Sequence, residues 1–344
     1  MRLLVPALLP RRRIPRGARP ARRSRRARLA VLLFPPLFVA VLCAAWAGTE
    51  AAVPAVTDPD CRAKLDLLRQ LRSERPNAPV GVVLGSSRLV WGFRPDALPA
   101  PAAGARVWFN GAHVGAGPAL QRIAFARLLR DGARPDAVAV EVMPTFLANE
   151  NARFVCGHVA VREYALARRY FNAPITFDYN FARLRLARAP DLARALDPLA
   201  GVPAYRPLGT HPTATETVTA DERQRRTAEA HKNNALFLQR PAVRPAADRA
   251  LRDLLSEAQA HGVRAVLVRT PEGATFRSWH PPERRAELDA YVRGLATDFA
   301  VPVIDARDWL EEGAFYDSHH MLRGGADAFT VRFVRELEVA LRDR

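Results

Sequence analysis

The chain has 344 residues, of which 49% are hydrophobic, and this length and composition exclude an intrinsically disordered protein. Its formal net charge is +17, but eleven of its 52 basic residues lie within residues 1–28, where no acidic residue occurs. The rest of the chain therefore has 41 basic residues against 35 acidic ones, and nearly all of the positive charge is arginine. A charge excess that lies mostly in one terminal arm argues against nucleic acid as a partner.

The stretch that follows this basic arm is uncharged over residues 29–47, LAVLLFPPLFVAVLCAAWA. A helix of this length can cross a bilayer, and the proline pair inside it would kink the helix without preventing the crossing. We therefore expect a cytoplasmic arm at 1–28 and a transmembrane helix or signal anchor at 29–48. The positive-inside rule then places the remaining chain on the periplasmic, extracytoplasmic side of the inner membrane. The alternative is a cleaved signal peptide, because AWA at 45–47 fits the small-x-small pattern of a cleavage site.

The next segment, 49–76, begins as a linker of small residues and continues as a short amphipathic helix at 64–75. It is followed by an unbroken apolar run at 80–85, which stops at Gly85 and gives way to two serines. Such a run predicts a strand that is buried on both faces and ends in a tight turn. In open α/β folds a turn of this kind lies at the carboxyl edge of a parallel sheet, where ligands bind.

Strands and helices alternate over the rest of 77–344, outside a segment at about 150–240. This rhythm indicates parallel βαβ units and so an α/β domain with a mainly parallel central sheet. The later strands are predicted at 105–110, 137–143, 263–268 and 301–304, and the helices at 118–130, 246–262, 282–299 and 326–341. In the segment at 150–240 we expect helices at 159–171 and 179–197 and a polar run at 209–233, which together form an insertion over one edge of the sheet.

The serine turn has a candidate partner far along the chain, in FYDSHHMLRGGA at 315–326, where Asp317 precedes His320 by three residues. A serine hydroxyl becomes an effective nucleophile when a histidine removes its proton, and a carboxylate on the far ring nitrogen fixes the tautomer. Backbone amides of Ser87 and of the glycine-rich turn at 111–117 would bind the oxyanion. Taken singly, two serines after a strand are more often a helix cap and Asp-x-x-His is more often a surface turn, but their conjunction favours a catalytic site.

Three of these stretches resemble conserved blocks of the SGNH (GDSL-type) hydrolase superfamily, in the family order. GSS at 85–87 is similar to the first block, with Ser87 at the position of the nucleophile. NGAHVGAGP at 110–118 is similar to the second block, and the glycine that donates to the oxyanion matches Gly115. DSHH at 317–320 resembles the last block, which makes His320 the base and Asp317 its orienting acid. The resemblance implies a flavodoxin-like three-layer α/β/α sandwich and acyl-ester chemistry without a metal or other cofactor.

The third block of that superfamily has no counterpart here. It should present Gly-x-Asn-Asp after the third strand, with the asparagine as an oxyanion donor, whereas residues 140–145 read VEVMPT. Loss of one such donor can lower the rate by roughly 10²–10³-fold. This departure is the reason to keep a second hypothesis, a non-catalytic envelope protein that retains the fold as a binding or scaffold module.

The first hypothesis is a membrane-anchored SGNH-type serine esterase or O-acyltransferase. Its substrate would be an acylated small molecule or a cell-envelope polysaccharide, with either water or a sugar hydroxyl as the acceptor. Four residues near the predicted sheet edge are candidates for substrate contacts, namely Arg88, Asn110, Glu272 and Arg277. No group of cysteines and histidines has the spacing of metal ligands, so we expect no metal. Cys61 and Cys156 either form a disulfide or are two free buried thiols.

Overall fold

The computed structural model describes residues 21–100, 102, 104–188, 202–240 and 243–342. Parts of the predicted arm at 1–28 and of the predicted helix at 179–197 therefore lie outside the described residues. The chain divides into two compact units, Met1–Ala45 and Trp46–Arg344.

The N-terminal unit contains most of α1 (Ala21–Ala52), which is continuous through Pro35 and Pro36. Within α1, the segment Arg25–Ala52 includes an 18-residue stretch with a mean hydropathy of 2.4, so the helix is long and apolar enough to cross a membrane, as signal sequences also are. Apolar side chains such as Leu32 and Phe34 are exposed. The predicted apolar helix is therefore confirmed, and its role as an anchor stays a prediction.

The second unit is built on a sheet of five parallel strands in the order β2-β1-β3-β4-β5. The strands are β1 (Val80–Leu84), β2 (Val107–Asn110), β3 (Ala137–Glu141), β4 (Arg264–Arg269) and β5 (Val303–Asp305). The chain runs from β1 outward to β2 and then crosses back over β1 to reach β3. Such a reversal opens a crevice at the carboxyl end of β1, which is where α/β folds bind ligands.

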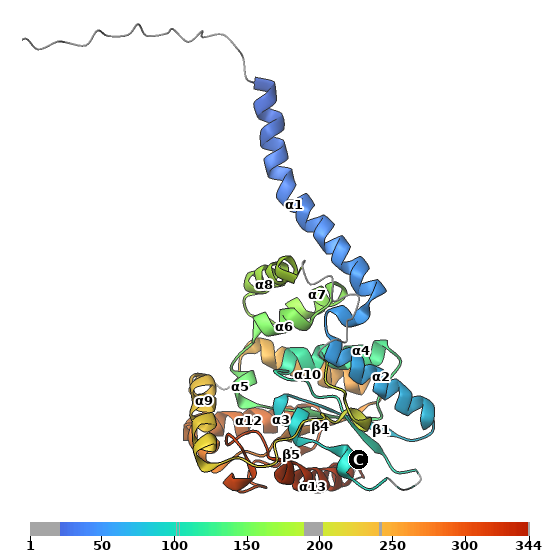
Figure 1. Ribbon diagram of the computed structural model, residues 1–344, viewed down its shortest axis with the longest axis vertical. Coiled ribbons are helices and arrows are strands. Elements are labelled where there is room, and N and C mark those ends of the chain that lie inside the picture. The colour runs from blue at the N-terminus through green and yellow to red at the C-terminus, as the bar shows by residue number, and fades with distance from the viewer. Residues whose placement is uncertain (1–20, 101, 103, 189–201, 241–242, 343–344) are drawn as a thin grey trace, which may run out of the picture. The chain divides into compact units, whose positions relative to one another are not determined.

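Alternating side chains of the strands fill two apolar layers, one on each face of the sheet. Val82 and Leu84 of β1 point into the first layer, and Val83 points into the second. The first layer is closed by α2 (Pro59–Glu74), α4 (Pro118–Arg130), α10 (Pro245–Ala260) and α12 (Pro282–Asp298). The second is closed by α3 (Ser87–Gly92) and α13 (Arg323–Arg342), and α13 lies across the sheet from α4 and α10 (Figure 1). The predicted α/β architecture with helices on both faces is confirmed.

The segment between β3 and β4 contains α5 (Pro144–Leu147), α6 (Ala152–His158), α7 (Tyr164–Arg168), α8 (Pro174–Arg188) and α9 (Ala220–Leu238). The helix predicted at 159–171 forms over its middle: Val159 and Ala160 are extended, and a 3₁₀ turn, Val161–Glu163, leads into α7, which ends at Arg168. The predicted polar run at 209–233 largely becomes α9, which begins after its N-cap Thr219. Few side chains of α9 are buried, so its sequence has little apolar periodicity.

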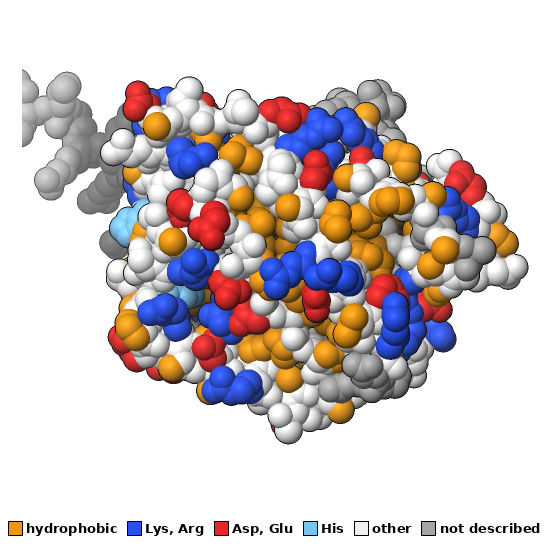
Figure 2. Space-filling view, turned by 90° about the horizontal axis from the view of Figure 1, so that it is seen from below, with side chains coloured by type: hydrophobic (Ala, Val, Ile, Leu, Met, Phe, Trp, Pro, Cys, Tyr) orange, Lys and Arg blue, Asp and Glu red, His pale blue; other side chains and the backbone are white. Residues whose placement is uncertain are grey.

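The surface of the molecule carries both signs of charge. Figure 2 shows lysine and arginine side chains interspersed with aspartate and glutamate on one face. Ion pairs such as Arg252 with Asp298, whose nitrogen and oxygen lie 2.8 Å apart, recur in the second unit. Exposed pairs of this kind contribute little to stability, about 0–1 kcal/mol each.

Candidate active site

The two serines that follow β1 occupy different environments. Ser86 is the N-cap of α3, is fully buried, and accepts a hydrogen bond from the Arg88 amide at 3.3 Å. Ser87 is the first residue of α3 and is partly exposed. The helix-cap interpretation of the serine pair therefore applies to Ser86, while the Ser87 hydroxyl is left to face the carboxyl edge of the sheet.

The structure brings Ser87 together with Asp317 and His320. The Ser87 Oγ lies 2.8 Å from His320 Nε2, across 233 positions of sequence, and His320 Nδ1 lies 2.7 Å from Asp317 Oδ2. The carboxylate is an acceptor, so Nδ1 carries the ring proton and Nε2 presents its lone pair to the serine hydroxyl. This is the geometry in which a histidine can take the serine proton while a carboxylate steadies the imidazolium.

The turn that holds Asp317 and His320 is fixed by its own backbone. Asp317 Oδ1 accepts the amides of His319 at 3.2 Å and His320 at 2.7 Å. Ser318 has a φ of +69°, a left-handed conformation that lets the chain double back between the acid and the histidine. The Ser318 Oγ accepts the Phe276 amide at 2.9 Å, which ties this turn to α11 (Ala274–Ser278) after β4.

Burial and charge act in opposite directions on the acid of this site. Burial alone would raise the pKa of the Asp317 carboxyl, but the hydrogen bond and the charge of His320 outweigh it and lower the pKa to about 2. Asp317 is therefore a carboxylate at neutral pH. Burial, with the adjacent His320, lowers the pKa of His319 to about 3, so His319 is neutral and packs on Phe276.

Aromatic side chains fix the plane of the His320 ring. Trp91 meets it edge-on, with ring centroids 5.2 Å apart, and Tyr316 stacks on it at 5.5 Å with an interplanar angle of 11°. Trp91 also contacts His211 of the segment between β3 and β4, at a centroid distance of 6.0 Å. The insertion therefore reaches the rim of the site.

The loop at 111–117 runs beside the serine turn. The His113 amide donates to the Gly85 carbonyl at 2.8 Å, which holds the loop against the end of β1. Gly115 has a φ of +69°, and a Cβ on it would lie 2.8 Å from the Phe154 ring, so glycine fits this position best. In the described part of the chain neither the Ser87 nor the Gly115 amide has a hydrogen-bond partner, whereas the amides of Ser86 and Arg88 are both used. The oxyanion role of Ser87 and Gly115 stays a prediction.

A buried glutamate lies where the third block would be. Glu141 is the last residue of β3, and its Oε2 accepts the Ser86 amide at 2.5 Å while its Oε1 accepts the Thr270 hydroxyl at 3.0 Å. A carboxylate cannot donate to an oxyanion, so Glu141 braces the nucleophile turn from behind. We did not single it out from the sequence, although a charge inside the apolar run AVAVEVM is a signal that could have revealed it.

Three of the four candidate substrate contacts are buried against the protein itself, and the fourth, Arg277, is half-buried. Arg88 is 1% exposed, lies 3.3 Å from Glu272, and donates to the carbonyls of Thr270 and Pro271. Glu272 is likewise buried. The sequence places these residues near Ser87 but does not give the direction of their side chains, and in α3 the residue after Ser87 points inward.

The other two candidates also support the scaffold. The Asn110 amide is fully buried and donates to the carbonyls of Leu89 at 2.9 Å and Phe93 at 2.7 Å, so it holds the end of α3. Arg277 is half-buried, and its Nη1 donates to the Arg307 carbonyl at 2.7 Å and to the Glu272 carbonyl, so its role as a substrate contact stays a prediction.

The cysteines are free thiols rather than a disulfide. Burial raises the pKa of Cys61 to about 11 and that of Cys156 to about 12, so both are protonated and unreactive at neutral pH.

Among the described residues, two groups of side chains have potential metal-ligating atoms within 4.8 Å of one another. The first is Asp317, His319 and His320. A metal there would take the carboxylate that His320 needs to orient its ring, so this group is better explained as the acid and base of the serine site. The second is Asp58, His113 and His158, which the sequence analysis did not bring together.

No family model matches the sequence, and no curated protein matches it. Among solved structures, one of a candidate acylhydrolase from Bacteroides fragilis is similar over 81% of this chain and 98% of that chain, with 13% identity and a TM-score of 0.39. One of an α/β-hydrolase enzyme from the metagenome of Lake Arreo in Spain is similar over 75% of this chain and 95% of that chain, with 12% identity and a TM-score of 0.29. Likeness at this level carries no inference about activity, so function rests on the geometry of the site.

Proposed function

We propose that the protein is a serine esterase or O-acyltransferase of the SGNH type that acts through an acyl-enzyme on Ser87. The observation that carries this proposal is the chain of short contacts from the Ser87 Oγ to His320 Nε2 at 2.8 Å and from His320 Nδ1 to Asp317 at 2.7 Å. Helix α1 would anchor the enzyme, with the catalytic unit on the periplasmic side. The substrate would be an ester on a small molecule or on a cell-envelope polysaccharide.

In the first half of the reaction, the Ser87 Oγ attacks the ester carbonyl as His320 Nε2 takes the hydroxyl proton. The negative charge on the carbonyl oxygen is bound by the Ser87 and Gly115 amides, and Asp317 stabilises the imidazolium. The carbon–oxygen bond of the ester then breaks, and His320 returns the proton to the departing alkoxide. In the second half, His320 activates water or an acceptor hydroxyl, which takes the acyl group and releases Ser87.

The test compares the full-length protein in detergent with its Ser87→Ala variant, using p-nitrophenyl acetate as substrate. We expect at least about a 10³-fold loss of hydrolysis, because the nucleophile is removed. Ser73→Ala is the matched control, since Ser73 is exposed on α2 and its hydroxyl bonds only the Gln70 carbonyl at 2.8 Å. It should keep the rate of the wild type.

Labelling gives a second readout. A fluorophosphonate probe should modify the wild type at Ser87 and leave Ser87→Ala unmodified, as located by peptide mass spectrometry. Unchanged hydrolysis in Ser87→Ala would remove this residue from the mechanism. A folded wild type that neither hydrolyses the ester nor takes the probe would favour the non-catalytic binding protein instead.

A further inference from the structure

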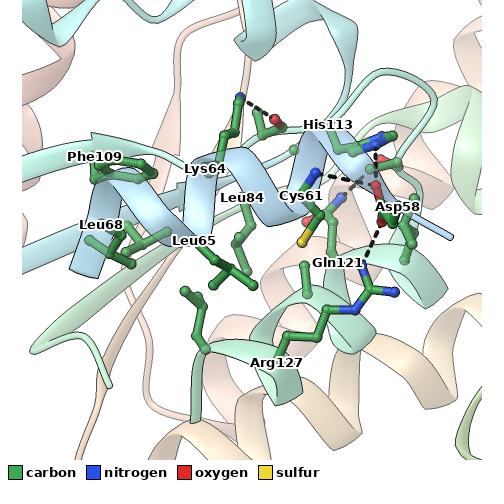
Figure 3. A pocket seen from close by; sticks show the side chains of 18 residues that line it. Asp58, Cys61, Lys64, Leu65, Leu68, Leu84, Phe109, His113, Gln121 and Arg127 are labelled. Atoms are coloured by element: carbon green, nitrogen blue, oxygen red, sulfur yellow. Dashed lines mark hydrogen bonds and ion pairs between the residues drawn. The ribbon is translucent and has the colours of Figure 1, made fainter. Parts of the chain in front are cut away.

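Three polar side chains from distant parts of the chain meet on the α2 side of the sheet. Asp58 is the N-cap of α2, His113 lies in the loop after β2, and His158 ends α6. Their ligand atoms all lie within 4.8 Å of one another, and the two imidazole centroids are 4.8 Å apart. Figure 3 shows the Asp58 carboxylate between His113 on one side and Arg127 on the other.

The hydrogen bonds of the two histidines determine which nitrogen of each ring can bind a cation. His113 Nδ1 lies 2.8 Å from the Val114 carbonyl, and His158 Nδ1 lies 2.9 Å from the Phe154 carbonyl. A carbonyl only accepts, so each Nδ1 carries a proton, and in a neutral ring Nε2 holds the lone pair. Histidines that ligate metals are oriented in the same way, by donating the other ring N–H to a carbonyl or carboxylate.

The contact between His113 and Asp58 requires a positive charge between them or on the ring. His113 Nε2 lies 3.2 Å from Asp58 Oδ1, and both atoms are acceptors when the ring is neutral. Two ligand atoms at about 2.1 Å from a tetrahedral zinc ion lie roughly 3.4 Å apart, so this separation already matches one edge of such a site.

Arg127 holds two of the ligands in place while its own charge is offset. Its guanidinium donates to Asp58 Oδ2 at 2.5 Å and to the His158 carbonyl at 2.5 Å. Asp58 Oδ1 lies 3.2 Å from His113 Nε2 and also accepts the Cys61 amide at 3.2 Å, as the N-cap of α2. Arg127 also forms a bidentate pair with Glu163, at 2.9 and 2.7 Å, so Asp58 is not needed to neutralise it.

We propose that Asp58 Oδ1, His113 Nε2 and His158 Nε2 form a binding site for one divalent transition-metal ion of the Zn²⁺ class, with a fourth position for water. Two imidazoles and one carboxylate suit zinc and its neighbours, whereas Mg²⁺ and Ca²⁺ prefer oxygen ligands. The ion joins the loop that carries Gly115 to α2 and α6. Its role is independent of whether Ser87 is a nucleophile.

The test measures metal content rather than activity. Full-length protein in detergent is dialysed against a chelator, equilibrated with Zn²⁺ or Co²⁺, freed of excess metal and analysed by mass spectrometry for metal per chain. We expect about one ion per chain in the wild type and almost none in His113→Gln and His158→Gln. His261→Gln is the matched control, because His261 is exposed at the end of α10, and it should retain the ion.

If a variant does not fold, measurements on the wild type alone still test the proposed metal site. Bound Co²⁺ should give the visible bands of a tetrahedral nitrogen and oxygen site, and Zn²⁺ should raise the thermal unfolding midpoint. A wild type that retains no metal would overturn the proposal and leave a protonated His113 paired with Asp58. Metal retained by both variants, with loss of fluorophosphonate labelling at Ser87, would place the ion at Asp317 and His320 and also overturn it.

Discussion

Replacing Glu141 with alanine should destabilise the protein strongly, although Glu141 touches no substrate. Its carboxylate is buried and accepts both the Ser86 amide and the Thr270 hydroxyl, at 2.5 and 3.0 Å. Glu141→Ala removes the acceptor of both buried donors. An unsatisfied buried donor costs about 1–3 kcal/mol, so we expect a loss of about 2–6 kcal/mol in the free energy of unfolding.

Glu141→Gln separates this effect from a general effect of changing the side chain. The glutamine carbonyl still accepts one of the two donors, and the Thr270 hydroxyl can turn to accept from the glutamine amide. One charge-assisted hydrogen bond becomes neutral, which costs about 1 kcal/mol. The glutamine variant should therefore keep most of the stability that the alanine variant loses.

Thermal unfolding of the full-length protein in detergent measures both variants. For a unit of this size 1 kcal/mol corresponds to roughly 2 °C in the unfolding midpoint, so we expect a fall of about 4–12 °C for alanine and about 2 °C for glutamine. Ester hydrolysis should fall with alanine as well, because the turn before Ser87 loses its support. A fall below about 2 °C for alanine, or equal falls for the two variants, would refute the role assigned to Glu141.

Two further predictions concern the triad and the oxyanion loop. Asp317→Asn should lower kcat/KM for p-nitrophenyl acetate by up to about 10⁴-fold, and a rate within tenfold of the wild type would contradict the triad. The folded pKa of Asp317, about 2, lies below its ordinary value of 3.8, so its stabilisation of about 2 kcal/mol is present above pH 4 and lost as pH falls towards 2. The midpoint of the wild type should thus fall more steeply over this range than that of Asp317→Asn. Gly115→Ala should lower both activity and the unfolding midpoint, because its Cβ would meet the Phe154 ring at 2.8 Å. Gly132→Ala is its control, because Gly132 has a similar φ of +71° but no atom lies within 4 Å of the new Cβ. Equal falls in the unfolding midpoint of the two variants would show that the Phe154 ring moves aside without destabilising the protein.

The strands could be predicted because each is an apolar run closed by glycine, proline or charge. Their bounds were less certain, since β2 begins at Val107 rather than at residue 105, and β3 ends at Glu141 rather than at 143. Helix α9 was missed because helix formation on an exposed surface leaves no apolar stripe in the sequence. The helix predicted at 159–171 begins only at Val161, because Val159 and Ala160 are extended and the Glu163 carboxylate accepts the Ala160 amide at 3.0 Å.

In the site, as in the fold, the sequence predicts what depends on local pattern and misses what depends on tertiary contacts. Ser87, Asp317 and His320 could be singled out from their order and spacing, and the structure brings them together. Arg88 and Asn110 were assigned as substrate contacts because they adjoin the site in sequence, whereas side-chain direction is set by packing. The cluster of Asp58, His113 and His158 could not be seen at all, because its members come from three elements and share no short spacing.

The separation of Ser87 from His320 by 233 positions has a consequence for folding. Ser87 leaves the ribosome long before the histidine that would activate it, because all five strands precede His320 in the chain. Closing so long a stretch of chain is slow compared with forming a helix or a local turn. An unfinished or misfolded chain therefore carries a serine without a base. Any chemistry at Ser87 is withheld until the whole unit has assembled.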